Sequence, residues 1–385
     1  MNSKPSLPPI RNQINNIDKK IVYLLAERKK LIFTIAASKI QNNQEIRDIE
    51  REKKLLHDLI NYGKKYHLTS EYITCIFQII IEESVLTQQM LLQQFYNNNK
   101  IYPSSFSFLG PNGSYSHIAL NEYAQRNCKK YIEKECSTFE EVLLSVENNY
   151  TDCAIVPIEN NSSGVISEVL SILKNINLFI IGEINICVNH CLLGLKNAKL
   201  KNIKTIYSHP QPFKQCSNFI RQFSHWKIKY SKSTTDAIRT VAQYKDITNA
   251  ALGSAIGGNI YKLNILATNV TNQEKNITRF ILLSKNKINI SPQIPAKTTI
   301  IFNKKNTSND LVKILILLQK NNITVKTISS KIKQNNLIEE VVYVDIPLNI
   351  SSSLMQDIIK KVIHLNTNIK ILGCYPSAKI IPAVL

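Results

Sequence analysis

The spacing of apolar residues separates a long helical region from the rest of the chain. Between Ile10 and Tyr102 there is no proline and a single glycine, Gly63, so the region lacks turn residues and is predicted to be helical. Apolar residues recur at helical spacing from Ile14 to Ile40, and two shorter helices are predicted at about 48–62 and 70–95. Two short helices cannot cover so long an apolar stripe, so we expect an intertwined helical homodimer or a higher homo-oligomer.

The middle of the chain has a different pattern. Eight of the ten glycines lie between Gly110 and Gly258. Short apolar runs end in polar loops and are followed by helical patterns, as at 106–117, 153–164 and 205–213. This alternation is typical of an α/β fold that binds ligands in the loops after its strands.

The last region follows a proline-containing linker at 291–295. Its pattern predicts a strand at 298–302, a helix at 308–320, strands at 323–329 and 340–346, a helix at 351–364 and a strand at 369–374. This βαββαβ order is that of an α+β ferredoxin-like unit. The fold class is therefore multidomain, with an all-α, an α/β and an α+β part.

The charge of the chain is strongly positive but dispersed. Its 385 residues include 48 basic and 28 acidic ones, for a formal charge of +20. The longest basic run is Arg28-Lys29-Lys30, and no basic stripe alternates with aromatic residues, so a nucleic-acid partner is disfavoured. Eight of the cations are arginine, the side chain whose planar fork binds a carboxylate in a bidentate way.

The eight cysteines form no C-x-x-C pair and lie mostly in apolar runs, which indicates reduced, buried thiols in a cytoplasmic protein. The segment from Cys187 to Cys191, which includes His190, fits no standard zinc spacing. No apolar run reaches the roughly 18 residues of a membrane span, and the N-terminus has no apolar signal core. We therefore expect no metal, cofactor or membrane.

Polar residues of the helical region share faces. Arg28 and Lys39 are eleven positions apart, which puts them about 20° from the same helix face and about 16 Å apart along the axis. Arg11 lies about 100° around and about 25 Å from Arg28, so it is expected to reach the same pocket from a partner chain. Taken singly, such residues are typical of solvated helix faces. The candidates are Arg11, Arg28, Lys39, Asp48, Arg51, Glu52, Ser84 and Gln88.

Residues 1–95 resemble the all-helical chorismate mutase domain of the bifunctional P-proteins, which join chorismate mutase to prephenate dehydratase. The matching segments are 24–28 (Leu-Leu-Ala-Glu-Arg), 47–52 (Arg-Asp-Ile-Glu-Arg-Glu) and 80–89 (Ile-Ile-Glu-Glu-Ser-Val-Leu-Thr-Gln-Gln). All eight candidates match residues of that family's pocket.

The resemblance implies a role for each candidate. The rearrangement of chorismate to prephenate is pericyclic, so the site has to hold a compact dianion and stabilise the charge that gathers on the breaking ether oxygen. Arg11 and Arg28 would bind the two carboxylates. Lys39 would donate to the ether oxygen with Gln88 beside it, and Glu52 would bind the hydroxyl. Asp48, Arg51 and Ser84 would complete the pocket.

Residues 104–285 resemble the two-lobed prephenate dehydratase domain of the same family, which is built like a periplasmic solute-binding protein. Five segments match: 110–117, 156–160, 208–213, 251–254 and 278–280. The resemblance implies that Thr278 donates a proton to the departing hydroxyl. Arg279 is expected to bind the side-chain keto acid, because holding the carboxylate that must leave would stabilise the ground state. Asn160, Ser208 and Gln215 are the other predicted prephenate-binding residues.

Residues 297–385 resemble the ACT regulatory domain, which binds phenylalanine in this family. Two effector segments depart from the family pattern. Asn309, Asp310, Leu311 and Val312 replace Gly-Ala-Leu-Val, and Ser329, Ser330, Lys331 and Ile332 replace Glu-Ser-Arg-Pro. The lost glycine removes a close backbone approach, and the lost Glu and Arg leave the charges of an amino acid poorly matched. We therefore expect weak or absent phenylalanine feedback.

The sequence thus predicts a bifunctional enzyme that converts chorismate through prephenate to phenylpyruvate, in phenylalanine biosynthesis. A non-catalytic amino-acid sensor is the main alternative, and the complete mutase set and the Thr278-Arg279-Phe280 segment argue against it. A coupled dehydrogenase is disfavoured because no G-x-G-x-x-G follows a strand.

Overall fold

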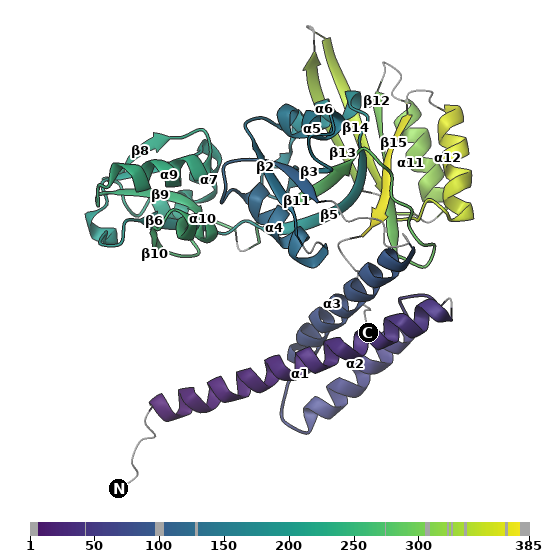
Figure 1. Cartoon of the computed structure of the whole chain (residues 1–385), viewed down its shortest axis with the longest axis horizontal. Helices are drawn as coiled ribbons and strands as arrows, with labels where there is room; N and C mark the ends of the chain where they lie inside the picture. Colours follow the sequence, from purple (N-terminus) through teal and green to yellow (C-terminus); the bar gives the residue numbers. More distant parts are fainter. Residues whose placement is uncertain are drawn as a thin grey trace. The chain divides into compact units, whose positions relative to one another are not determined.

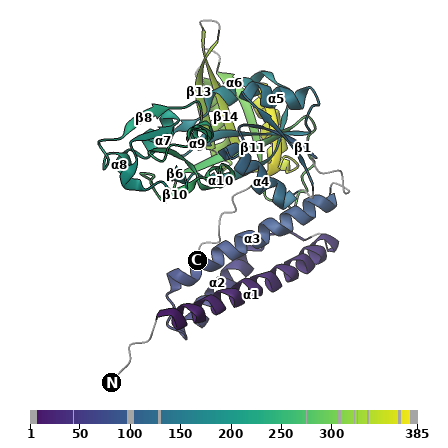
Figure 2. The same cartoon turned by 60° about the vertical axis from the view of Figure 1, so that its left-hand side comes forward.

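The computed structural model describes residues 7–42, 44–96, 104–127, 130–273, 275–304, 309–321, 323–324, 326–334, 337–365 and 369–377. The chain forms two compact units. The first comprises Met1–Lys100, Ile290–Ile294 and Lys379–Leu385, and the second comprises Ile101–Asn289 and Pro295–Ala378. Figures 1 and 2 show the elements of each unit from two directions.

The first unit is helical, as predicted. Its helices are α1 (Leu7–Gln41), α2 (Ile49–Lys64) and α3 (Ser70–Tyr96). Asp48 begins α2 by accepting a hydrogen bond from the Arg51 backbone nitrogen. Helix α3 packs against both α1 and α2, and each helix buries apolar residues, such as Ile32 of α1, Leu56 of α2 and Val85 of α3.

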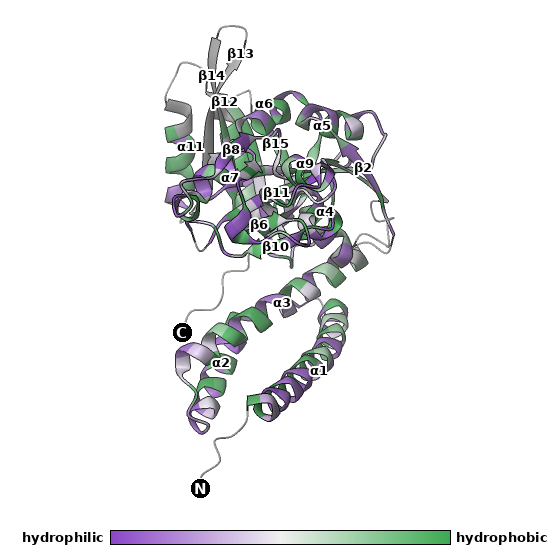
Figure 3. Cartoon of the chain, turned by 90° about the vertical axis from the view of Figure 1, so that its left-hand side faces the viewer, coloured by the Kyte–Doolittle hydropathy of each residue, from purple (hydrophilic) through white to green (hydrophobic). Residues whose placement is uncertain are grey.

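The N-terminal half of α1 leaves its apolar residues exposed within one chain. Ile14, Ile17 and Ile21 are 50–56% exposed, whereas only Ile32 and Ala36 of this helix are buried. Green apolar and purple polar residues both occur along α1 and α3 in Figure 3. The predicted stripe therefore exists, and the described part of this chain does not cover it.

Helix α3 is more apolar than the sequence pattern indicated. Its segment Ser70–Gln93 is long and apolar enough to cross a membrane by length and composition alone, with 33% of the apolar window buried. A core helix of a folded protein passes the same test. Buried Ser84, Thr87, Gln88 and Gln89 lie on this helix, and buried polar side chains indicate packing against protein rather than lipid.

The second unit begins with an α/β lobe. Its sheet has the order β2-β1-β3-β11-β5, with β4 paired to β3. Strands β1, β2 and β3 run parallel, and β11 pairs antiparallel with both β3 and β5. The elements are β1 (Ser105–Leu109), α4 (Tyr115–Asn127), β2 (Ile132–Cys136), α5 (Phe139–Glu147), β3 (Cys153–Asn160), β4 (Gly164–Val165), α6 (Ser167–Asn175), β5 (Phe179–Cys187) and β11 (Ile277–Ser284).

A second lobe is inserted between β5 and β11, with a sheet of order β10-β6-β9-β7-β8. The chain crosses between lobes twice, after β5 and before β11, which confirms the predicted two-lobed α/β architecture. The elements are β6 (His190–Gly194), η1 (Leu200–Asn202), β7 (Thr205–Ser208), α7 (Pro210–Gln215), α8 (Ser217–Ile220), β8 (Lys227–Tyr230), α9 (Thr234–Tyr244), β9 (Asn249–Ser254), α10 (Ala255–Ile260) and β10 (Asn264–Ala267).

The C-terminal part has the predicted βαββαβ order. Its antiparallel sheet runs β13-β14-β12-β15. The hairpin of β13 and β14 is longer than predicted. Both strands continue through a charged segment, in which Lys331 and Glu340 are register partners. The elements are β12 (Ala296–Lys304), α11 (Asn309–Lys320), β13 (Lys326–Gln334), β14 (Leu337–Ile346), α12 (Ser353–Leu365) and β15 (Ile369–Pro376).

The two faces of this sheet have different partners. Ile300, Val342 and Val344 share a core with α11 and α12, which cover one face (Figure 1). The alternate residues Ile301 and Tyr343 share a core with β3, β11 and α6 of the first lobe. Because successive strand residues point to opposite faces, the C-terminal sheet joins its own helices to the first lobe, and the second unit is continuous.

Candidate active sites

Arg28, Ser84 and Gln88 form one polar group between α1 and α3. The Arg28 guanidinium donates to Ser84 Oγ, which in turn donates to the Ile80 carbonyl oxygen at 2.6 Å. Gln88 Nε2 donates to the Ser84 carbonyl oxygen at 3.2 Å, and Gln88 Oε1 has no hydrogen-bond partner among the described residues. Burial lowers the pKa of Arg28. The structure therefore joins these three predicted residues and leaves an unpaired polar atom beside them.

Lys39, Asp48 and Glu52 form a second polar group where α1 leads into α2. Lys39 Nζ donates to the Ile46 carbonyl oxygen. The pKa of Lys39 is lowered by burial, with a contribution from the positive charge of Arg51, although the negative charges of Asp48 and Glu52 oppose this. Glu52 is buried, so this group combines a partly desolvated ammonium with a buried carboxylate.

The sequence prediction missed Arg47 at this site. Its Nε and Nη2 atoms lie 3.2 and 3.1 Å from the two oxygens of Glu52, as a bidentate pair. The scarcity of arginine in the chain was the signal that could have identified it. Arg51 and Arg11 are exposed, and Arg11 has no hydrogen bond or ion pair with the described residues of its own chain.

Asn160 and Thr278 are held together where β3 and β11 pair. They are register partners, and Asn160 Nδ2 donates to Thr278 Oγ1 at 2.8 Å and to Asn276 Oδ1 at 2.7 Å. Asn160 Oδ1 accepts from the backbone nitrogens of Ser162 and Ser163, each at 2.9 Å. Because the Thr278 hydroxyl accepts from Asn160, its own proton is available to another acceptor.

Ser208 and Gln215 are engaged elsewhere in the second lobe. Ser208 is fully buried, and its hydroxyl donates to the Leu252 carbonyl oxygen at 2.9 Å. Gln215 Oε1 lies 3.0 Å from His190 Nε2. Burial lowers the pKa of His190 although the Gln215 hydrogen bond opposes this, so the neutral ring donates from Nε2. A substrate contact of Ser208 through its hydroxyl does not fit this geometry.

The two lobes approach each other closely at Gly113. The Ser254 hydroxyl donates to the Gly113 carbonyl oxygen at 3.0 Å and accepts from the Gly257 nitrogen at 2.9 Å. A Cβ atom at Gly113 would lie 3.0 Å from Gly257 Cα, and Gly113 has a φ angle of +91°. Glycine is therefore required here both for conformation and for space. Two of the five matching segments, 110–117 and 251–254, meet at this contact.

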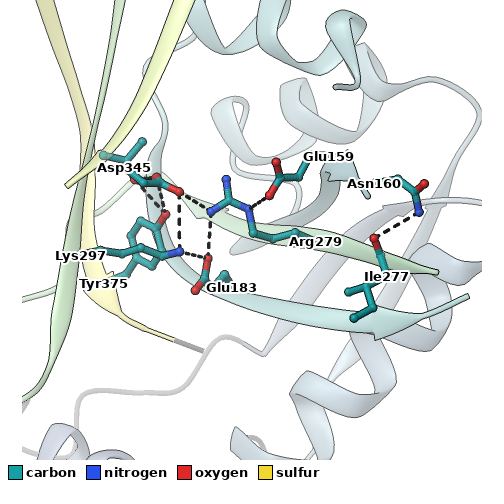
Figure 4. Close-up of polar contacts among 9 residues, drawn as sticks. Glu159, Asn160, Glu183, Ile277, Arg279, Lys297, Asp345 and Tyr375 are labelled. Carbon is teal, nitrogen blue, oxygen red and sulfur yellow. Dashed lines mark hydrogen bonds and ion pairs between the residues drawn. The ribbon is translucent and has the colours of Figure 1, made fainter. Parts of the chain in front are cut away.

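Arg279 lies in a buried cluster of charged residues, which we call the Arg279 network. Arg279 Nε is 3.1 Å from Glu159 Oε1, and its Nη1 is 3.4 Å from Glu183 Oε2 and in contact with Asp345. Lys297 Nζ lies 2.6 Å from Glu183 Oε2. Figure 4 shows the guanidinium among these carboxylates. The members are Glu159, Glu183, Arg279, Lys297 and Asp345.

Electrostatics keep Arg279 and Asp345 ionised. Burial raises the pKa of Asp345, but the positive charges of Arg279 and Lys297 and a hydrogen bond from Thr299 outweigh it and leave that pKa below its ordinary value. Burial lowers the pKa of Arg279, but electrostatic interactions with Tyr343, Asp345, Tyr375 and Glu183 raise it by more and leave that pKa above its ordinary value. The guanidinium and the Asp345 carboxylate are therefore charged together.

Thr278 and Arg279 face opposite sides of the sheet. Phe280 and Leu282 share a core with α4 and β1, whereas Ile281 shares a core with Tyr343 of the C-terminal sheet. Strand alternation puts Thr278 on the first side and Arg279 on the second. The predicted contact between Arg279 and the keto acid of prephenate does not fit this geometry, because carboxylates already surround the guanidinium.

The predicted effector residues lie in the C-terminal part. The backbone places 309–312 at the start of α11 and 329–332 within β13. The side chain of Val312 is 51% exposed. The side chains of the other seven lie outside the described part of the structure. The effect of these residues on phenylalanine binding therefore stays a prediction.

Comparison with known proteins identifies two families on the chain. Residues 10–89 match chorismate mutase type II, and residues 106–288 match prephenate dehydratase. The bifunctional chorismate mutase/prephenate dehydratase of Buchnera aphidicola subsp. Acyrthosiphon pisum (strain APS) is 59% identical over 382 residues, and that of Escherichia coli (strain K12) is 43% identical over 382 residues. Each match covers 99% of both chains.

A solved structure shares the fold of the second unit. The prephenate dehydratase from Arthrobacter aurescens, in complex with L-Phe, superposes with a TM-score of 0.64 at 22% identity. The match covers 73% of this chain and 92% of that one. With these matches along its whole length, the chain belongs to the family of bifunctional chorismate mutase/prephenate dehydratases, enzymes of phenylalanine biosynthesis.

Proposed function

We propose that each activity has a separate site and uses the residues predicted for it, except the Ser208 hydroxyl and Arg279 in the dehydratase. The mutase site is supported by the convergence of Arg28, Ser84 and Gln88 on one side and of Lys39 and Glu52 on the other. The dehydratase site is supported by the hydrogen bond from Asn160 to Thr278. The domains are proposed to span residues 1–95, 104–285 and 297–385.

In the mutase site, positive charge and hydrogen bonds would fix the substrate in its reactive shape. Arg28 binds one carboxylate of chorismate, and Lys39 donates to the ether oxygen where negative charge develops. Gln88 lies beside the ether oxygen, and its unpaired Oε1 is available to a ligand. Glu52 accepts from the hydroxyl, while Asp48, Arg51 and Ser84 complete the pocket.

The second carboxylate of chorismate is assigned to Arg11 of another copy of the chain. Two observations support this: Arg11 has no partner among the described residues of its own chain, and the apolar stripe at Ile14, Ile17 and Ile21 beside it is exposed. Association of two α1 helices would cover this stripe and bring Arg11 to a neighbouring pocket. The proposed state is a homodimer or a higher homo-oligomer.

In the dehydratase site, Thr278 would protonate the departing ring hydroxyl as carbon dioxide leaves. Threonine is a weak acid, so the proton transfer is concerted with departure. Asn160 orients the Thr278 oxygen, and Gln215 remains a candidate contact to prephenate. Arg279 is left out of the pocket, because three carboxylates hold it. The site as described uses side chains of this chain alone.

Two single variants test this division of labour. Lys39→Ala is expected to abolish chorismate rearrangement while leaving phenylpyruvate formation from prephenate unchanged. Thr278→Ala is expected to do the reverse, so that prephenate accumulates from chorismate. Loss of both activities in either variant, or of neither, would overturn the corresponding assignment.

The C-terminal part is proposed to be an ACT regulatory domain with weakened phenylalanine feedback, in a cytoplasmic enzyme. Its βαββαβ order and sheet order support the domain assignment. Asp310 and the Ser329–Ile332 segment, which replace family effector residues, support the weakened response. Titration of dehydratase activity with phenylalanine tests this, and half-inhibition at low micromolar phenylalanine would contradict it.

A further inference from the structure

The Arg279 network joins the C-terminal sheet to the strand that carries Thr278. Arg279 is the next residue after Thr278 in β11. Across the sheet it lies opposite Glu159 of β3, and it also contacts Glu183 of β5. Its contact with Asp345 reaches β14 of the C-terminal sheet. One guanidinium therefore connects three neighbouring strands of the first lobe to a second sheet.

Asp345 is itself fixed by several partners. Thr299 Oγ1 donates to Asp345 Oδ1 at 2.6 Å, and Lys297 Nζ lies 3.7 Å from Asp345 Oδ2. The ring of Tyr343 lies beneath the guanidinium, with its centroid 5.6 Å from the Arg279 Cζ atom. Asp345 is 5% exposed and Arg279 is 6% exposed. These contacts thus hold the Arg279 guanidinium and the Asp345 carboxylate each in a fixed position.

Stability alone is a poor explanation for such a cluster. Burying Glu183, Arg279 and Asp345, with Glu159 and Lys297 partly buried beside them, carries a large desolvation cost. Apolar residues of similar volume often stabilise a domain contact as well or better. The ion pairs and hydrogen bonds of the network are directional, so they do fix the position of the Arg279 side chain. Because the network begins one residue from Thr278, a shift of Arg279 along or across β11 displaces the Thr278 hydroxyl.

We infer that Arg279 is a positioning residue for the dehydratase, and that its contact with Asp345 lets the C-terminal sheet hold Thr278 in its reactive place. This inference rests on the proposed role of Thr278 as proton donor. It gives the C-terminal part a direct route to the reactive hydroxyl. Arg279 acts here through Thr278 and does not touch the substrate.

The test is a kinetic comparison of full-length variants with prephenate as substrate. Asp345→Asn keeps the shape of the side chain and removes its charge, so the Arg279 contact weakens. Misplacement of a reacting group by about 1 Å can lower a rate by about 100-fold. We therefore expect kcat to fall by at least about tenfold, with KM within about twofold of the unaltered chain.

A matched control separates positioning from docking in general. Lys370 also joins the C-terminal sheet to the first lobe, donating to the carbonyl oxygens of Leu173 and Ile176 on α6 and after it, away from β11. Lys370→Met is expected to leave kcat within about twofold. Equal losses in Asp345→Asn and Lys370→Met, or an unchanged kcat in Asp345→Asn, would overturn the inference.

Two further measurements complete the design. If Asp345→Asn does not fold, Thr299→Val, which removes the hydrogen bond to Asp345, decides in the same way: a selective fall in kcat supports the inference and an unchanged kcat overturns it. Thr278→Ala is measured in the same series. An active Thr278→Ala would refute the proposed function itself, whereas an inactive Thr278→Ala with an unaffected Asp345→Asn refutes only the positioning role.

Discussion

Replacement of Asn160 by aspartate should slow the dehydratase while keeping the three hydrogen bonds that the Asn160 oxygen accepts. The introduced carboxylate would keep the acceptor that binds the Ser162 and Ser163 nitrogens. It would replace the amide that donates to Thr278 Oγ1 at 2.8 Å with a second carboxylate oxygen. The Thr278 hydroxyl would then donate its only proton to that oxygen, and prephenate would receive none.

The size of the effect follows from the hydrogen bond that must be broken. A hydrogen bond to a charged group contributes about 1.5–3 kcal/mol, which corresponds to a fall in kcat of about 10- to 150-fold. The lost donations to Asn276 Oδ1 and the Ile277 carbonyl oxygen, drawn in part in Figure 4, should lower the free energy of unfolding by about 2 kcal/mol. The chain should therefore fold but fail to protonate the leaving hydroxyl.

The assay is the rate of phenylpyruvate formation from prephenate, with mutase turnover measured on the same preparation. Asn161→Asp is the matched control: Asn161 bridges the same strand ends by donating to the Lys275 carbonyl oxygen and accepting from the Ile277 nitrogen, both at 2.8 Å, without contacting Thr278. We expect this control to keep kcat within about threefold. A folded Asn160→Asp chain with unchanged kcat would refute the reasoning.

Three other predictions concern the two units separately. Because burial lowers the pKa of Lys39, mutase activity that needs the ammonium form should fall as pH rises toward that lowered pKa; Lys39→Arg should move this fall to higher pH, and an unmoved pH profile would contradict the role. In Gly373→Ala, the new Cβ would lie 2.3 Å from the Ile180 carbonyl oxygen, so the free energy of unfolding should fall by about 1–3 kcal/mol and the melting temperature should drop with it. An unchanged melting curve would count against the contact between β15 and β5. The pair Ile14→Asp and Ile17→Asp should convert the proposed dimer to a monomer in sedimentation velocity and abolish mutase but not dehydratase activity, whereas an unchanged sedimentation coefficient would argue against association through α1.

The helices and strands were predicted well, because proline, glycine and the spacing of apolar residues determine them over short stretches of sequence. The absence of proline and the near absence of glycine between Ile10 and Tyr102 predicted the helical region that forms α1, α2 and α3. Glycine-rich loops between short apolar runs gave the two-lobed architecture. The extended β13–β14 hairpin was underestimated, since charged residues there interrupt the apolar alternation that identifies a strand.

The sequence pattern could not predict which side chains on different strands contact one another. The pairing of Asn160 with Thr278 depends on β11 lying between β3 and β5, and a non-consecutive strand order leaves no local signal. The position of Arg279 could have been predicted in part. As the neighbour of Thr278 in a strand it had to face the opposite side, although the identity of Asp345 as its partner required the fold.

The most direct test of two independent sites on one chain is a mixing experiment. Lys39→Ala and Thr278→Ala chains are each given chorismate, alone and in equal mixture, and phenylpyruvate is followed over time. The account predicts that the Lys39→Ala chain alone is limited by the uncatalysed rearrangement of chorismate, and the Thr278→Ala chain alone by the uncatalysed dehydration of prephenate. The mixture should form phenylpyruvate faster than either chain, because prephenate released by one chain is consumed by the other. A mixture that remains inactive, or a single variant that completes both steps, would contradict it.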